Sequence, residues 1–215
     1  MIEQRIHDIS FSEADFDVFT IPGLEPRMNA IITTVRPKLT KLGELIAPEL
    51  SLLTGDEMFP HVAKHARRKV HAPNDTWVAW AANKKGYKML PHFQVGLFAS
   101  HLFIQFAIIY ESSHKAIFAQ ALTDQLDDVI RLVPKTYQWS MDHMKPDAVP
   151  HADMTKESFT AMAAKLSSAK HSEVMAGIRL DRKDPVLQDA EKLYGLILDT
   201  FKTLMPLYRM SFPSA

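Results

Sequence analysis

The stretch HFQVGLFASHLFIQFAIIY, residues 92–110, decides the fold because it contains two apolar strands separated by a two-residue turn signal. A turn at Ala99-Ser100 would pair Gln94 with Gln105 in an antiparallel hairpin. Successive side chains of a strand point to opposite faces, so one face of this hairpin is entirely apolar. That face consists of Phe93, Val95, Leu97, Leu102, Ile104, Phe106 and Ile108. We predict that it forms the core side of an antiparallel sheet.

The opposite face of the hairpin mixes aromatic rings with hydrogen-bonding groups. It presents His92, Gln94, Gly96, Phe98, His101, Phe103, Gln105 and Ala107. Such a face is typical either of an outer surface in contact with water or of a wall that lines a ligand site. The sequence leaves both interpretations open.

Further elements are predicted on both sides of the hairpin from hydrophobic periodicity and from capping and breaking residues. Extended segments are predicted at residues 77–82, 137–141 and 174–180. Helices are predicted from Ser10 through Phe16, from Pro26 with a kink at Pro37 and a stop at Pro48, over 60–70, from Ser112-Ser113 to Pro134, over 155–169, and from Asp184-Pro185 to Pro206. Strands in the middle and helices before and after them predict an α+β fold.

The chain length supports this prediction. A chain of 215 residues forms one domain, or one core assembled from two similar halves, and buries about 70% of its unfolded surface. We therefore predict a single α+β domain over residues 1–215, with helices packed against a mainly antiparallel sheet.

Composition excludes several classes of function. Lysine plus arginine and aspartate plus glutamate both number 25, so net charge does not indicate a nucleic acid or a membrane as the partner. The absence of cysteine excludes disulfides, thiol nucleophiles and cysteine-ligated metals. The seven glycines form neither a dinucleotide fingerprint nor a P-loop. The N-terminus lacks a signal-peptide core and no apolar run is long enough to span a bilayer, so we expect a cytoplasmic protein without a membrane partner.

Positive charge is concentrated in residues 58–92, which hold seven bases and one acid. Within it, His61, His65 and Arg68 would share one face of the predicted helix. Two imidazoles one turn apart can hold zinc only with a further ligand, and Val62 stands where an HExxH metalloprotease carries its glutamate. The sequence therefore identifies no metal site and no cofactor.

Anion binding is the preferred interpretation of this segment, because arginine holds phosphates and carboxylates bidentately. The candidate ligand-binding residues are Arg67, Arg68, His61, His65, His92 and His101. The alternatives are a merely solvated basic face and, for His92 and His101, histidines that cap exposed backbone.

The sequence also offers candidates for catalysis and for nucleic-acid binding. Asp56 and Glu57 could act as a general base or metal ligand together with His61 and His65, or they could simply be helix N-terminal charges paired with nearby arginines. Residues 77–88 interleave aromatic and basic side chains as a single-stranded nucleic acid requires, but no recognition motif accompanies them.

Six segments resemble the YktB-like family of uncharacterised bacterial proteins, which is a domain of unknown function. They are FSEADFDVF (11–19), GLEPRM (23–28), VRPKL (35–39), LTGDEMFPHVAKHARRKV (53–70), KGYKMLPHFQVGLFASHLFIQFAIIYES (85–112) and TFKTLMPLYR (200–209). The resemblance extends over nearly the whole chain and implies a compact cytosolic α+β domain. It supplies no activity, substrate, cofactor or catalytic residue.

The sequence thus favours a small anionic ligand at a basic, histidine-rich site. A metal-assisted hydrolase and a nucleic-acid or protein interaction module are the alternatives, and the oligomeric state is left open.

Overall fold

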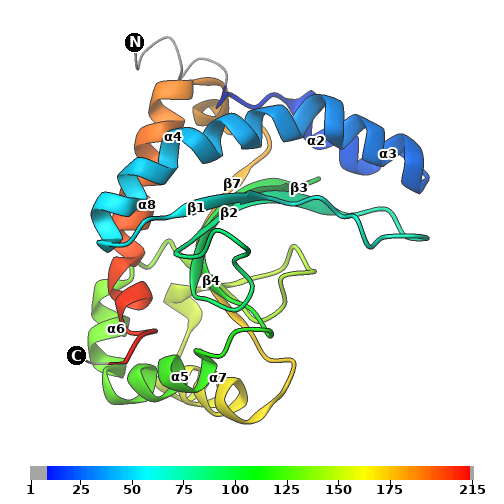
Figure 1. The fold of residues 1–215 in the computed structure, drawn as a ribbon. Helices are drawn as coiled ribbons and strands as arrows, with labels where there is room; N and C mark the ends of the chain where they lie inside the picture. The colour runs from blue at the N-terminus through cyan, green and yellow to red at the C-terminus, as the bar shows by residue number, and fades with distance from the viewer. Residues whose placement is uncertain (1–8, 214–215) are drawn as a thin grey trace.

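The computed structural model describes residues 9–213. A seven-stranded antiparallel sheet in the order β1-β2-β3-β4-β7-β5-β6 runs through the molecule (Figure 1). The strands are β1 (Phe59–Val62), β2 (Asp75–Ala81), β3 (His92–Phe98), β4 (His101–Ile108), β5 (Gln138–Ser140), β6 (Val149–Pro150) and β7 (Val174–Asp181). The predicted hairpin is confirmed, including its register, since Gln94 pairs with Gln105. The α+β class is also confirmed: the chain forms a single compact domain.

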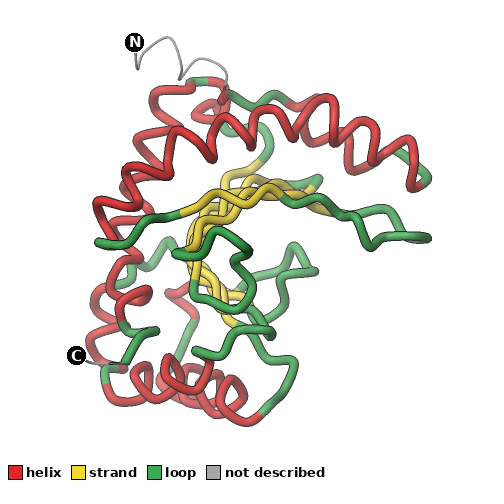
Figure 2. Tube along the Cα trace, in the orientation of Figure 1, coloured by secondary structure: helices red, strands yellow, loops and turns green. Residues whose placement is uncertain are grey.

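The helices are α2 (Glu13–Asp17), α3 (Leu24–Ala30), α4 (Arg36–Thr54), α5 (Lys115–Asp124), α6 (Leu126–Leu132), α7 (Lys156–Ser168) and α8 (Ala190–Arg209). Short 3-10 turns lie at Val18–Thr20, His151–Asp153 and Pro185–Gln188. The sheet is strongly curved, and the helices lie along the outside of the bend (Figures 1 and 2). We call this outer side the convex face and the inner side the concave face.

The convex face is the predicted apolar face, and it forms the core. All seven predicted core residues of the hairpin are fully buried. Helix α8 contributes Phe201, whose ring lies 4.8 Å from the ring of Phe93, and α5 contributes Phe118, 5.7 Å from Phe106. Burial of apolar area is the main stabilising contribution at such a face, at about 25 cal/mol per Å².

The concave face is covered by loops, chiefly residues 63–74, 82–91 and 141–148 (Figure 2). Two glycines allow neighbouring groups to approach the strands closely here. A Cβ at Gly177 would lie 2.0 Å from the carbonyl oxygen of Ile104, and a Cβ at Gly96 would lie 2.4 Å from the ring of Phe103. Both positions therefore exclude any side chain.

Two predicted helix stops are wrong. Pro48 lies inside α4 and Pro206 inside α8, because the apolar stripes continue beyond them to the buried Leu50 and Tyr208. Pro48 is exposed, so the carbonyl that it leaves without a donor can be hydrated. The sequence predicts a kink at Pro37. In the structure Pro37 lies in the first turn of α4, and the segment directly before this helix, Ile31–Val35, is π-helical.

The predicted helix over 60–70 is also wrong. Val62 pairs with Val78 at the edge of the sheet, so β1 replaces the first turn. The chain then becomes irregular, with His65 at a φ of 51°. The guanidinium of Arg36 donates to the carbonyls of Ala63 and Lys64. These two carbonyls would accept from backbone amides if the segment were helical. Tertiary contacts here override local helix propensity.

Helix boundaries differ at two further places. The capping box at the first helix uses Ser12 with Asp15, not Ser10 with Glu13. Asp184 caps only the 3-10 turn that follows it, and Asp189 caps α8. No helix within residues 9–213 is both long and apolar enough to cross a membrane.

Candidate functional site

The residues singled out in the sequence do not form one cluster. Since residues 60–70 are not helical, His61 and His65 do not share a helix face. His61 lies on β1, where its Nε2 is 2.8 Å from the carbonyl oxygen of Asn83. The imidazole of His65 stands edge-on to Trp77 at 5.5 Å. Burial, then Arg68 and Arg36, lower its pKa to about 4.

The remaining candidates are also dispersed. Asp56 and Glu57 are exposed beyond the end of α4, and Arg67 is exposed in the 63–74 loop. His101 begins β4 opposite Asp181, and burial lowers its pKa to about 4. Neutral, buried histidines do not supply positive charge to an anion.

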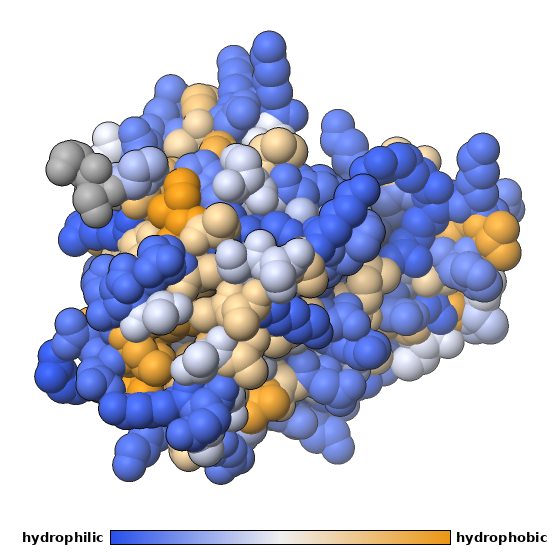
Figure 3. All heavy atoms as spheres, turned by 90° about the horizontal axis from the view of Figure 1, so that it is seen from below, coloured by the Kyte–Doolittle hydropathy of each residue, from blue (hydrophilic) through white to orange (hydrophobic). Residues whose placement is uncertain are grey.

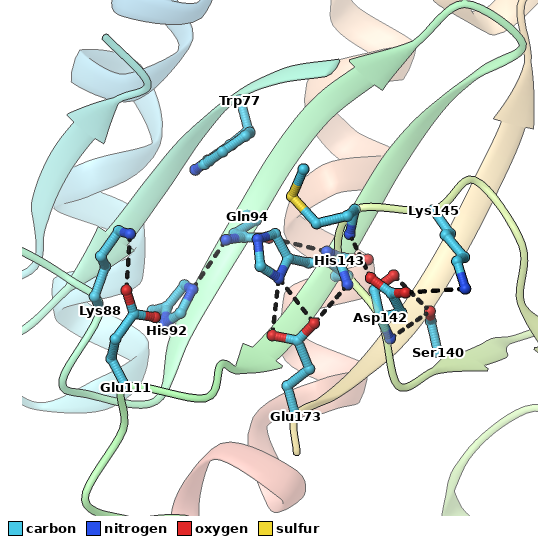
Figure 4. A network of polar contacts seen from close by, with 12 residues as sticks. Trp77, Lys88, His92, Gln94, Glu111, Ser140, Asp142, His143, Lys145 and Glu173 are labelled. Carbon is cyan, nitrogen blue, oxygen red and sulfur yellow. Dashed lines mark hydrogen bonds and ion pairs between the residues drawn. The ribbon is translucent and has the colours of Figure 1, made fainter. Parts of the chain in front are cut away.

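His92 orients two amides on the concave face. It is fully buried, and burial lowers its pKa to about 4. Its Nδ1–H donates to the carbonyl of Leu90 at 2.7 Å, and its Nε2 accepts from the Gln94 amide at 2.9 Å. Gln94 Oε1 in turn accepts from Gln105 at 2.9 Å. This chain fixes the protonated nitrogen of His92 and the orientation of both glutamines (Figure 4).

Beside the two glutamines lies a tight pocket whose free volume is about 10 Å³, room for about one water molecule. Strands β2, β3, β4, β5 and β7 and the 141–148 loop form it. Its lining residues are Asp75, Trp77, Gln94, Phe98, Phe103, Gln105, Ser140, Asp142, His143, Lys145, Met175 and Arg179. We call it the concave pocket. The polar face of the hairpin is therefore not an outer surface, since it is buried and Gln94, Phe98, Phe103 and Gln105 line this pocket.

His143 is held in the pocket by Glu173, which precedes β7 and is only 4% exposed. Both carboxylate oxygens lie 2.8 Å from Nδ1, and one accepts from the backbone N–H of His143 at 2.7 Å. Figure 4 shows the imidazole of His143 directed at the Glu173 carboxylate. Burial alone would lower the pKa of His143, but the hydrogen bond and charge of Glu173 outweigh it and raise the pKa. Within residues 9–213, Nε2 has no hydrogen-bond partner.

Asp75 is the second unusual group. It is 3% exposed at the start of β2. Its carboxylate accepts a hydrogen bond from its own backbone N–H, and no other side chain within residues 9–213 donates to it or pairs with it. Burial raises its pKa to about 6, against the opposing charges of His143 and Arg68. A buried ionisable group whose pKa is strongly shifted inside a pocket is typical of functional sites.

Arg179 provides positive charge at the pocket. Its guanidinium donates to the carbonyls of Pro146 and Asp147, and it forms no ion pair with a carboxylate in the part of the chain described here. Burial lowers its pKa. At the rim, Lys145 pairs with Asp142 at 3.3 Å. The pocket therefore combines a guanidinium without a carboxylate partner, a buried carboxylate without a side-chain partner and an oriented imidazole within the described residues.

Two larger hollows contain neither Asp75, His143 nor Arg179. One of about 570 Å³ shares Ser140, Asp142 and Lys145 with the concave pocket. A groove of about 830 Å³ between α5, α6 and the end of α8 is lined mainly by apolar side chains, and its charged residues are exposed at the rim. In the view from below, apolar side chains gather across the middle of the surface (Figure 3). No group of three histidine, aspartate or glutamate side chains in the described residues could hold a metal ion.

Sequence reasoning missed Asp75, His143, Glu173 and Arg179. Asp75 was visible as the one acid among seven bases, directly before a buried strand. Glu173 likewise precedes the apolar strand that begins at Val174. His143 and Arg179 carried no signal, since their roles depend on contacts made by the folded chain.

Comparison with known proteins confirms the resemblance seen in the sequence. A family model described as a domain of unknown function, DUF1054, matches residues 11–208. A UPF0637 protein of Bacillus velezensis is 47% identical over 201 residues, covering 94% of this chain and 96% of that protein. Another from Bacillus cytotoxicus is 45% identical over 201 residues, covering 94% and 97%. A third, from Bacillus licheniformis, is 45% identical over 203 residues, covering 94% and 96%.

Proposed function

Since the chain belongs to the DUF1054 family, whose description names no activity, we propose a function from the pocket itself: binding of a small anionic molecule on the concave face. The observation that carries the proposal is the guanidinium of Arg179, which lines the pocket and donates only to backbone carbonyls within residues 9–213. The anion remains the expected ligand class, but its site moves from the basic segment to the concave pocket.

Arg179 and Asp75 define which chemical groups the ligand must present, because neither has a charged side-chain partner within residues 9–213. The guanidinium of Arg179 has no carboxylate partner within residues 9–213, so an anionic group supplies one. Asp75 requires a hydrogen-bond donor, because an ionised carboxylate only accepts. The amides of Gln94 and Gln105 are held in fixed orientation and add donors and acceptors. A carboxylate that carries a hydroxyl group matches this combination, because the hydroxyl can donate to Asp75. A carbonyl group in its place could accept from the amides but could not donate to Asp75.

The size of the pocket limits the ligand. Its free volume of about 10 Å³ admits only a group of about the size of water. A ligand of three or four carbon atoms therefore requires the 141–148 loop to move outward. This movement breaks the exposed rim pair of Lys145 and Asp142, which contributes about 0–1 kcal/mol. It also breaks the contacts that hold the loop from β7 and the residue before it, where Glu173 accepts from His143 and Arg179 donates to the carbonyls of Pro146 and Asp147.

Isothermal titration calorimetry with pyruvate, lactate, 2-oxobutyrate and inorganic phosphate tests the proposal. We expect one or more of these probes to bind to wild type, and Arg179→Gln to weaken that binding at least tenfold. Arg67→Ala removes an exposed arginine outside the pocket and is the matched control. Equal binding by wild type and Arg179→Gln, or a loss caused by Arg67→Ala alone, would contradict the site.

We also propose that the protein acts in the cytoplasm. A chain without cysteine suits a reducing compartment, although it does not require one. Fractionation of the source cells would test this location, and recovery in the secreted fraction would contradict it.

A further inference from the structure

We infer that the 141–148 loop is a lid, held closed over the concave pocket by Glu173 and Arg179, and that an anion bound at Arg179 releases it. The inference rests on the proposed anion site and adds the regulation of that site. The observation that carries it concerns the guanidinium of Arg179. This group, which the pocket offers to an anion, already donates to two backbone carbonyls of the loop.

The loop is attached at both ends of β7. Glu173 lies directly before this strand and accepts from the backbone N–H of His143 at 2.7 Å and from its Nδ1 at 2.8 Å. Arg179 lies near the end of the strand and donates to the carbonyls of Pro146 and Asp147. Both attachments are hydrogen bonds to a charged side chain, which are stronger than those between neutral groups.

The loop has few other attachments to the rest of the molecule. No side chain of residues 142–148 is buried, and residues 144–147 are exposed. The ring of Tyr110 lies 6.4 Å from the imidazole of His143 and nearly parallel to it. The remaining side-chain contacts of Asp142 and Lys145 within residues 9–213 are made inside the loop or with Ser140 at its start. Segments with so little buried apolar surface open locally, so the closed position depends mainly on Glu173 and Arg179.

The closed loop separates Arg179 from open space. With the loop in place, the free volume of the concave pocket is about 10 Å³. The neighbouring hollow of about 570 Å³ shares Ser140, Asp142 and Lys145 with this pocket, and Asp147 also lines it. A hollow of this size can admit a small molecule. We therefore expect an anion to reach Arg179 from the hollow when residues 146–147 move aside.

The anion and the loop compete for the same donors. A carboxylate or phosphate binds a guanidinium through two parallel N–H groups. Both terminal nitrogens of Arg179 already donate to the loop, one to the carbonyl of Pro146 and the other to that of Asp147. An anion that takes these nitrogens gains the stronger, charge-assisted bonds and leaves both carbonyls to water. It therefore binds the open state more tightly and shifts the loop toward it. Conversely, the closed loop lowers the apparent affinity for the anion.

Amide hydrogen exchange measures the lid directly, without a ligand. The backbone N–H of His143 reports on closure, because its acceptor is Glu173, outside the loop. Its protection factor is obtained by NMR on ¹⁵N-labelled protein. We expect Arg179→Gln to lower this factor at least tenfold, although Glu173 is unchanged, because the loop loses its second attachment. Lys145→Ala is the matched control: it removes only the exposed pair with Asp142 and should leave the factor within about twofold.

The amides of β4 control for global unfolding, since this strand lies between β3 and β7 in the sheet. Their protection should be the same in wild type and in both variants. An unchanged His143 protection factor in Arg179→Gln would overturn the lid. An equal loss of protection in β4 would overturn it as well, because the opening would then be global.

Lactate and inorganic phosphate test release in the wild-type protein, so this experiment does not depend on the folding of a variant. A probe that binds in calorimetry should lower the protection of the His143 amide at least tenfold at saturation and leave β4 unchanged. Binding with His143 protection unchanged or raised would overturn release by the anion and leave the anion site standing. Loss of protection in Arg179→Gln without binding by either probe would overturn both the anion site and its control of the lid.

Discussion

The convex face of the sheet carries Phe93 and Ile104 beneath helices, whereas the concave face carries His92, Gln94 and Asp75 beneath loops. Both sets are almost completely buried. On the convex face burial stabilises the fold. On the concave face it penalises charge, as the raised pKa of Asp75 and the lowered pKa of His92 show. A protein retains such costly groups where function requires them, which favours the concave face as the functional side.

The largest effect should come from the convex face. Phe93→Ala removes a ring that packs against Phe201 and Tyr208, with ring centroids 4.8 and 5.2 Å away. We expect a loss of about 3–5 kcal/mol in the free energy of unfolding, measured by urea denaturation. A loss below about 1 kcal/mol would show that this face is not the core.

Next in size is Glu173→Gln, which breaks a buried pair and should cost about 3 kcal/mol. The raised pKa of His143 means that the pair stabilises the fold fully below the unfolded pKa and loses this contribution as pH rises through the folded pKa. Urea denaturation should therefore show a larger loss at pH 6 than at pH 9. A loss independent of pH, or one unchanged in the His143→Gln background, would contradict the pair.

Asp75→Asn should stabilise the protein. The folded pKa of about 6 lies above the unfolded value of 3.8, so ionisation opposes folding as pH rises through this range. At pH 8 the asparagine variant should gain about 2–3 kcal/mol, and the gain should disappear below about pH 4. Melting curves of both proteins from pH 4 to 8 measure it. A variant less stable than wild type at pH 8 would indicate a partner for Asp75 that the pocket lacks.

The smallest effect should come from the basic segment. Arg67→Ala removes an exposed side chain, so the free energy of unfolding should change by less than about 0.5 kcal/mol. Urea denaturation again provides the measurement. A change above about 1 kcal/mol would mean that this arginine makes structural contacts like those of Arg36.

The convex face was predictable because the residues that determine it are close together in the sequence. The alternation of Phe93, Val95 and Leu97 fixes the face, and the turn at Ala99-Ser100 fixes the register. The prediction failed at residues 60–70, where helical spacing competed with a sheet edge and with the guanidinium of Arg36. The sequence alone does not show whether the helix or the sheet edge is more stable, because the sheet edge depends on contacts with distant segments.

The site was largely unpredictable because its members are far apart in the chain. Asp75, His143 and Arg179 meet only through strand order, which the sequence does not state. The polar face of the hairpin was the useful clue, since Gln94 and Gln105 do line the pocket. The histidine spacing of His61 and His65 was misleading, because it matched a helix that does not form.

The most direct test of the concave site is a titration of ¹⁵N-labelled protein with lactate, followed by heteronuclear NMR. The indole N–H of Trp77 and the side-chain amides of Gln94 and Gln105 all report on the pocket. We predict that these three signals shift together with one dissociation constant while the backbone amide of Arg67 stays unchanged. Shifts centred on Arg67 and its neighbours, with the pocket signals unmoved, would contradict the account.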